Sequence, residues 1–322
     1  MFFSVVIPLF NKQDYVHRAI RSVLAQTHAN FELIIVDDGS TDNSAAIVKA
    51  ISDIRIKLIQ QVNGGVSKAR NTGAKFAKAG WIAFLDADDE YDPDFLKEAI
   101  TFLKSYKEAR LSFLGANYFL GTRDRTAMPE ELKTGVYDYY QLFGNQRSPS
   151  HSSTTIVNKI DFLLVGGFPE GVKQFEDWIT WFKLGMVGDF GYIGKPLGFY
   201  HSVEGSVART KRNSKEFYND AVLLSEMLHQ YLNKEFLAPF KRENVKKCMN
   251  SFALSISSYL ARDGAKVLAL KMLKFVSIRY YIWQYNKSFK ILLHLIIPQF
   301  LKLIYRHFRW GRTGVNKNTS KN

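Results

Sequence analysis

Three aspartates gather at the end of an apolar run in the first third of the chain. Asp86, Asp88 and Asp89 follow residues 81–85, whose composition predicts a short buried strand. In an open α/β sheet, ligands bind beyond the carboxyl ends of the strands. Carboxylates gathered there call for a cation, and a hard divalent ion that bridges to phosphates is the usual one. Taken alone, the segment would also suit a solvated turn before the next helix.

Two further predicted strands end in polar residues. Asn11 follows the first strand, and Asp37 and Asp38 end the second. We expect these side chains at the same sheet edge as the aspartates, because carboxyl ends of parallel strands meet there. Arg70 follows two glycines at the start of a helix, which suits a diphosphate. The edge predicts a nucleotide-diphosphate site without a dinucleotide-binding glycine fingerprint; the alternative for Asp37 and Asp38 is a turn with a helix cap.

Another acidic pair, Glu176-Asp177, stands at the start of a later predicted helix. Acidic side chains at a helix N-terminus complement the helix dipole, and this structural role is the simpler interpretation of the pair alone. The functional interpretation is a general base that takes a proton from a hydroxyl group.

The elements that must position these residues alternate between strand and helix patterns. Strands are expected at residues 4–9, 32–36, 56–60, 81–85 and 111–119, and helices at 14–25, 40–51, 66–79 and 93–106. This order predicts an α/β fold with a mostly parallel sheet and helices on both faces. Further on we expect strands at 152–157, near 192 and at 197–201, and helices at 137–143, 161–165 and 176–185.

The pattern becomes wholly helical from about residue 214 to about 308. We therefore predict a domain at residues 1–210, an all-helical extension at 211–310, and a disordered basic tail at 311–322. The single Cys248 excludes an internal disulfide and fits a reducing compartment. Neither a signal peptide nor an apolar span of 18 residues is evident, so a cytoplasmic location without a spanning helix is expected.

Six motifs in order along the chain resemble one enzyme family. The sequence is similar to the inverting family 2 glycosyltransferases of the GT-A fold, of the type that builds bacterial surface polysaccharides. The resemblance covers roughly residues 3–206. The motifs that carry it are Val6-Ile7-Pro8-Leu9-Phe10-Asn11, Ile35-Val36-Asp37-Asp38-Gly39-Ser40, Ala69-Arg70-Asn71-Thr72-Gly73, Phe84-Leu85-Asp86-Ala87-Asp88-Asp89, Val165-Gly166-Gly167-Phe168 and Glu176-Asp177-Trp178.

The resemblance implies a nucleotide-sugar site at the sheet edge. Pro8 and Asp38 would hold the nucleotide base, with Asp37 and Asn11 beside it. Arg70 would lie near the base or the diphosphate.

The resemblance also implies the catalytic and metal residues. Asp86 would face the ribose, and Asp88 would bind Mg²⁺ or Mn²⁺ on the diphosphate. Asp177 would be the catalytic base. His201 matches a position that adds a metal contact in some members, although a histidine after an aromatic residue is often only packed in a loop.

The implied reaction is inverting transfer of a sugar from a nucleotide-sugar, by family habit a UDP-sugar, to a saccharide hydroxyl. The acceptor would be linked to polyprenyl diphosphate, and the protein would be peripheral on the inner face of the cell membrane. A noncatalytic nucleotide-sugar-binding protein is one alternative. Transfer to a protein, a teichoic acid or a soluble sugar is another.

The net charge of +14 is concentrated in the last part of the chain. Residues 205–322 contain 22 Lys and Arg against 6 Asp and Glu, and residues 264–322 contain twelve basic residues and no acidic one. Nucleic-acid binding is disfavoured, because this charge lies away from the predicted site. Basic, aromatic and aliphatic residues interleaved at helical spacing favour an interfacial helix on an anionic membrane. A packed bundle with a solvated basic face, or a homo-oligomer interface, is the alternative.

We therefore expect the full-length protein to float with anionic liposomes, and salt to remove only part of it. Each Lys or Arg near an anionic surface contributes about 1 kcal/mol, whereas inserted apolar side chains add a salt-resistant part. A variant truncated near Gly264 should stay off the liposomes and still bind nucleotide. A full-length protein that ignores anionic liposomes would make the tail a bundle or an oligomer interface.

Overall fold

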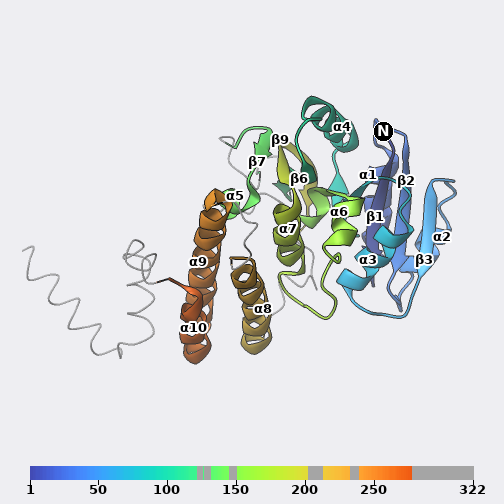
Figure 1. Cartoon of the computed structure of the whole chain (residues 1–322). Coiled ribbons are helices and arrows are strands. Elements are labelled where there is room, and N and C mark those ends of the chain that lie inside the picture. Colours follow the sequence, from blue (N-terminus) through green and yellow to red (C-terminus); the bar gives the residue numbers. More distant parts are fainter. Residues whose placement is uncertain (122–125, 127–131, 145–150, 202–212, 233–238, 278–322) are drawn as a thin grey trace, which may run out of the picture.

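The computed structural model describes residues 1–121, 126, 132–144, 151–201, 213–232 and 239–277 (Figure 1). Its described strands form one sheet in the order β3-β2-β1-β4-β8-β6-β9-β5, with β7 paired to β9. The predicted tail at 311–322, and the extension beyond residue 277, lie outside the described residues.

The first half of the sheet is parallel, as the alternating pattern predicts. It contains β1 (Phe3–Leu9), β2 (Phe31–Asp37), β3 (Ile56–Gln60) and β4 (Trp81–Phe84). The crossover helices are α1 (Val16–Leu24), α2 (Ser44–Lys49) and α3 (Val66–Phe76). The parallel register brings the ends of β1, β2 and β4 to a common edge.

The second half of the sheet is mixed. Its strands are β5 (Glu90–Tyr91), β6 (Leu111–Leu120), β7 (Gly135–Tyr137), β8 (Thr155–Asn158) and β9 (Asp189–Tyr200). Strand β8 is antiparallel to both β4 and β6, whereas β6 and β9 are parallel. The single long β9 replaces the two short strands expected near 192 and 197–201, and β5 and β7 carry no pattern that predicts them. The predicted fold class is confirmed.

Strand β1 separates two hydrophobic cores. Val6 points to the face covered by α3, α6 (Lys159–Leu164) and α7 (Glu176–Val187). Its neighbours Val5 and Ile7 point to the face covered by α1, α2 and α4 (Phe95–Ser105). This alternation follows from the period of two of a β-strand, and it places a helix layer on each side of the sheet.

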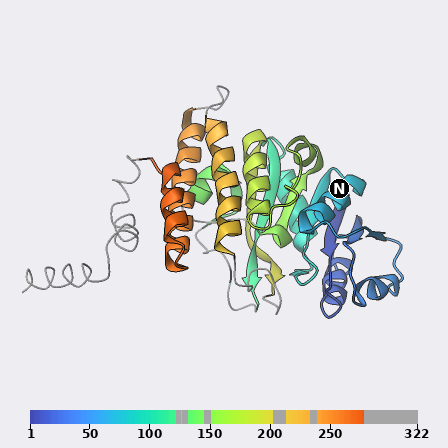
Figure 2. The ribbon, with the colours of Figure 1, turned by 90° about the horizontal axis from the view of Figure 1, so that it is seen from below.

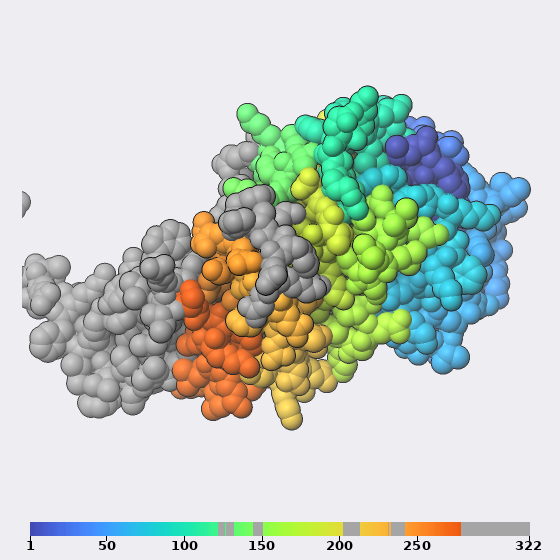
Figure 3. All heavy atoms as spheres, viewed as in Figure 1, coloured from blue at the N-terminus to red at the C-terminus, as the bar shows by residue number. Residues whose placement is uncertain are grey.

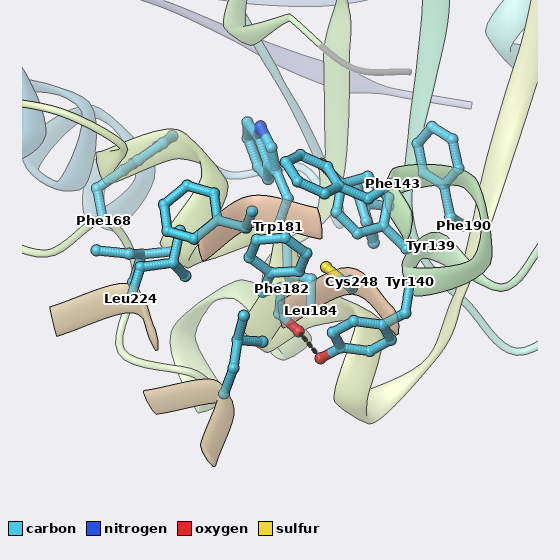
Figure 4. Packing of buried hydrophobic residues seen from close by; sticks show 14 of the residues in the cluster. Tyr139, Tyr140, Phe143, Phe168, Trp181, Phe182, Leu184, Phe190, Leu224 and Cys248 are labelled. Atoms are coloured by element: carbon cyan, nitrogen blue, oxygen red, sulfur yellow. Dashed lines mark hydrogen bonds between the residues drawn. The ribbon is translucent and has the colours of Figure 1, made fainter. Parts of the chain in front are cut away.

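The C-terminal helices share the first of these cores. Helices α8 (Ser214–Leu232), α9 (Pro239–Arg262) and α10 (Lys266–Met272) pack beside α5 (Tyr139–Gly144) and α7, as Figure 2 shows from below. In Figure 4, Cys248 of α9 and Leu224 of α8 lie among the aromatic side chains of α5 and α7. The Tyr140 hydroxyl donates a 2.6 Å hydrogen bond to the carbonyl of Phe182 in this core.

This shared core affects the truncation proposed above. Ala269 and Met272 of α10 are fully buried against α9, so a chain that ends near Gly264 would lose part of its core. Ending the chain after Ser277 keeps all the described helices and still removes 45 residues.

In Figure 3 the segment of α8 to α10 extends the molecule on the side away from β1 to β3. Within the described part of the chain, no helix is long and apolar enough to cross a membrane.

Gly73 allows α3 to lie close to β1. A Cβ at this position would stand 2.3 Å from Cγ1 of the fully buried Val6. Alanine favours a helix interior over glycine by about 1 kcal/mol, but overpacking a core costs about 1–3 kcal/mol. We expect Gly73→Ala to lower the free energy of unfolding in a denaturant titration. Gly80→Ala is the matched control, because a Cβ there meets nothing within 4 Å. Equal stability of the two variants would contradict this packing argument.

Candidate active site at the sheet edge

The predicted site residues lie at or near the carboxyl-end edge of the sheet. Asn11, Asp38 and Asp86 follow β1, β2 and β4, and His201 follows β9. Asp177 lies in the first turn of α7. Ion pairs join two parts of this set, since Arg70 of α3 contacts both the loop after β4 and the start of α7.

Asp37 and Asp38 are buried and already hydrogen-bonded by the protein. The Asp38 carboxylate accepts from the backbone N–H groups of Gly64 and Gly65, at 2.7–3.1 Å, and from the Gln61 side chain at 2.7 Å. Asp37 accepts from the Ser40 backbone N–H at 3.0 Å and from the Gln60 side chain at 3.0 Å. Asp38 therefore fixes the loop before α3, whereas Asp37 fixes the turn after β2 and the end of β3.

Asn11 joins the loops that follow β1 and β2. Its backbone is left-handed, with φ of 50°, a conformation that asparagine tolerates better than most residues. Its Oδ1 accepts from the Thr41 backbone N–H at 2.8 Å, and its own N–H donates to Ser40 Oγ at 3.0 Å. Pro8 lies in β1 opposite Val36 of β2, one residue before that strand ends.

Arg70 is 3% exposed and makes two ion pairs. One guanidinium nitrogen lies 2.6 Å from Asp86 Oδ1, and another lies 3.2 Å from Glu176 Oε1. Burial acts to lower the pKa of Arg70, but the charges of Asp86 and Glu176 outweigh it, so that pKa is raised. Burial likewise acts to raise the pKa of Asp86, and the Arg70 charge outweighs it, so that pKa lies below its usual value. Both groups are therefore charged at neutral pH.

The Arg-Asn and Gly-Gly-Phe motifs contact each other. The Asn71 amide donates to the Phe168 carbonyl at 2.8 Å, and its oxygen accepts from the Phe168 N–H at 2.9 Å. Gly167 has φ of 64°, and a Cβ there would stand 2.5 Å from the Asn71 oxygen. The Phe168 ring in turn lies 5.1 Å from the Arg70 guanidinium. These motifs therefore position Arg70 and the start of α7.

Asp88 is held by cations from the first loop and helix. Lys12 Nζ lies 2.6 Å from Asp88 Oδ2, and Arg18 of α1 donates to the Asp88 carbonyl at 2.7 Å. Arg18 also lies 3.1 Å from Glu90. Lys12 could not be identified from the sequence, because a lone lysine in a polar loop carries no periodic or motif signal.

Asp89 has a structural role that could not be told from its place in the aspartate motif. It is 1% exposed, and it accepts from Ser153 Oγ at 2.5 Å and from the His201 backbone N–H at 2.9 Å. Burial and the charge of Asp86 raise its pKa well above the usual value. His201 Nε2 lies 2.8 Å from Glu90 Oε1. Asp89 and Glu90 thus tie the end of β9 to the loop after β4.

Asp177 has the properties of a proton acceptor at neutral pH. Burial and the adjacent charge of Glu176 raise its pKa to about 7, although Arg70 acts in the opposite direction. A base works best when its pKa lies near the operating pH. Phe175, just before the helix, is left-handed with φ of 65° and aligns this first turn. The helix-dipole role alone does not explain an aspartate held at this pKa.

Three ring side chains that were not predicted as site residues, His151, Tyr118 and Tyr200, pack together beside these carboxylates. The His151 ring packs 5.0 Å from Tyr118 and 4.9 Å from Tyr200. Its Nδ1 accepts from the Ser153 N–H at 3.2 Å, so the neutral ring carries its proton on Nε2. Burial lowers the pKa of His151 and raises that of Tyr118 to about 12, with the charges of Asp89 and Asp177 contributing to the latter. No motif marks these residues, which come from β6, the loop before β8, and β9.

The predicted metal residues do not form a complete set of protein ligands in the described part of the chain. Among the described residues, no three His, Cys, Asp or Glu side chains form a group that could hold an ion by themselves. Mg²⁺ is often bound by one or two carboxylates together with substrate phosphates. Asp88 suits that role, because its half-buried carboxylate already attracts the Lys12 ammonium. His201 has one ring nitrogen engaged with Glu90.

The sequence and the fold are both similar to known glycosyltransferases. An uncharacterized glycosyltransferase of Rickettsia conorii is 32% identical over 202 residues, which are 60% of this chain. This chain covers only 32% of that relative's length. Among solved structures, S. aureus TarS 1–349 in complex with UDP-GlcNAc superimposes with a TM-score of 0.69 at 20% identity, covering 92% of this chain and 82% of that one.

A second solved structure has the same fold at lower similarity. The mannosyltransferase PcManGT from Pyrobaculum calidifontis, in complex with GDP-Man and Mn²⁺, has a TM-score of 0.55 at 17% identity and covers 91% of this chain and 85% of that one. The model of glycosyl transferase family 2 matches residues 4–154. The predicted GT-A fold is therefore confirmed, and residues 4–154 of this chain match glycosyl transferase family 2, in agreement with the predicted family.

Proposed function

We propose that this protein transfers a sugar from a UDP-sugar to a saccharide hydroxyl, with inversion and with a divalent metal ion. The observation that carries the proposal is Asp177, a half-buried carboxylate with a pKa of about 7 beside the strand-end edge that bears Asp86 and Asp88. The UDP-GlcNAc bound to TarS supports a UDP-sugar donor, and the Mn²⁺ bound to PcManGT supports the metal.

In this proposal the strand-end loops bind the donor and α7 supplies the base. The loop held by Asp38 lies against the nucleotide base, and Asp86, paired with Arg70, faces the ribose. Mg²⁺ or Mn²⁺ on Asp88 would neutralise charge on the departing nucleoside diphosphate. Asp177 takes the proton of the acceptor hydroxyl as that oxygen attacks the anomeric carbon from the face opposite the leaving group. A single displacement of this kind inverts the anomeric configuration.

The acceptor and the membrane contact extend the same proposal. A saccharide linked to polyprenyl diphosphate fits a protein whose C-terminal residues are strongly basic, because they would hold it at an anionic bilayer. Residues 1–210 would carry the donor site, and residues 211–310 would contribute the membrane contact. A noncatalytic sugar-nucleotide-binding protein is the alternative, and transfer activity separates the two.

Replacing Asp177 tests the base directly. Asp177→Asn should keep nucleotide binding and lose transfer by about 100-fold or more, the scale that loss of a general base often reaches. Transfer is measured as acceptor-dependent UDP release, and binding as a thermal shift with UDP and Mn²⁺. Asp161→Asn is a matched control. Asp161 is also buried, but it pairs with Arg110, the residue just before β6, away from the site. Wild-type turnover in Asp177→Asn would contradict the assignment and leave Glu176 as the next candidate.

The pKa of Asp177 also predicts a pH dependence. Transfer should rise with pH through about 7 as the carboxyl loses its proton, and this inflection should be absent from the residual activity of Asp177→Asn. The stability effect has the opposite sign. The folded-state pKa lies above the unfolded value near 3.8, so the contribution of this group to stability is lost as pH rises through about 7. Asp177→Asn should therefore gain stability relative to wild type in thermal unfolding as the pH rises from 3.8 to about 7, and an unchanged difference over this range would contradict the raised pKa of Asp177.

A further inference from the structure

The Lys12 ammonium forms an ion pair with Asp88, the carboxylate that is proposed to bind the metal ion. Its Nζ lies 2.6 Å from Asp88 Oδ2, and the side chains of both residues are half-buried. The Lys12 backbone is anchored, because its N–H donates to Ser44 Oγ at 2.8 Å. The side chain above this anchor is a four-carbon stem with rotatable bonds. The main chain is therefore fixed while the ammonium can move.

Two described arginines at this edge are held by groups other than the Asp88 carboxylate. Arg70 forms ion pairs with Asp86 and Glu176 and is buried. Arg18 donates to the Asp88 carbonyl and pairs with Glu90. The Lys12 ammonium has one carboxylate partner and a looser contact, 5.6 Å from the centre of the Tyr15 ring. A planar guanidinium held at two polar groups gives up its position less readily than such an ammonium. Of these three described cations, Lys12 is therefore the one that can move most readily.

We propose that Lys12 holds the Asp88 carboxylate while the donor site is empty, and moves to the nucleotide diphosphate when donor and metal ion arrive. The inference rests on the proposed function, because it needs a diphosphate and a metal ion at Asp88. An ammonium and a divalent cation on the same carboxylate repel each other, which favours the departure of the ammonium when the metal ion binds. The incoming diphosphate provides the negative charge that receives the displaced ammonium. Metal ion and nucleotide should then bind cooperatively, and the metal ion alone should bind weakly.

The Lys12→Met variant tests this exchange, because methionine keeps a long flexible side chain and removes the charge. Binding of Mn²⁺ alone, followed by electron paramagnetic resonance of the free ion, should become about tenfold tighter than in wild type. Binding of UDP in EDTA, followed by calorimetry, should become about tenfold weaker. The favourable coupling between Mn²⁺ and UDP should shrink accordingly.

Three further variants locate the effect. Lys195→Met removes an ion pair of similar length, 2.7 Å to Glu98, on another part of the protein, and should match wild type in both measurements. Lys12→Arg keeps the charge and should not tighten Mn²⁺ binding. Adding Asp88→Asn to Lys12→Met should abolish the gain in Mn²⁺ affinity, because the gain arises at that carboxylate.

The outcomes separate this inference from the proposed function. Unchanged or weaker Mn²⁺ binding in Lys12→Met, or unchanged UDP binding in EDTA, with normal UDP and Mn²⁺ binding by wild type, would overturn the exchange alone. Wild-type protein that binds no UDP, with or without Mn²⁺, would overturn the proposed function and the exchange with it.

Discussion

The arrangement of the site depends on the two ion pairs of the Arg70 guanidinium. It joins the loop after β4 to the first turn of α7, two segments about ninety residues apart, through Asp86 and Glu176. A buried ion pair contributes little net stability by itself, but removing one partner leaves an uncompensated charge and costs about 3–5 kcal/mol. The two ion pairs of Arg70 therefore act mainly by positioning these segments. They hold the loop that carries Asp86 next to the helix turn that carries Asp177.

The same guanidinium influences the chemistry available to α7. Asp177 is pushed toward its neutral form by burial and by Glu176, and Arg70 opposes both. The balance leaves a carboxyl group that can change its protonation state near neutral pH. The hydrogen bonds between Asn71 and Phe168 hold α3, which carries Arg70, against the turn that precedes α7. Two motifs that look independent in the sequence are thus parts of one support.

A second support holds the opposite side of the site. Asp89 is buried in the middle of the aspartate motif and binds Ser153 and the backbone of His201. Its raised pKa agrees with a role inside the protein, as opposed to one facing a ligand. The three carboxylates of Asp86-Ala87-Asp88-Asp89 therefore have three different environments, paired with Arg70, with Lys12 and with Ser153 respectively. The C-terminal helices stabilise the same framework, since α8 to α10 share the core of α7.

The local pattern of the sequence determined the parallel half of the fold and the edge at which the site lies. Strands β1 to β4 and their helices follow from residue periodicity, and parallel strands of alternating order must bring their carboxyl ends together. Together with the family resemblance, this pattern selected Asp38, Asp86 and Asp177 as site residues, and their roles stay predictions. The tertiary structure alone decided which side chains pair, because contacts such as Lys12 with Asp88, 76 residues apart, depend on packing and leave no periodic signal. For the same reason β5, β7, the His151 group and the joining of α8 to α10 to the central core could not be predicted. The pKa of Asp177 near 7 belongs with them, because burial exists only once the chain has folded.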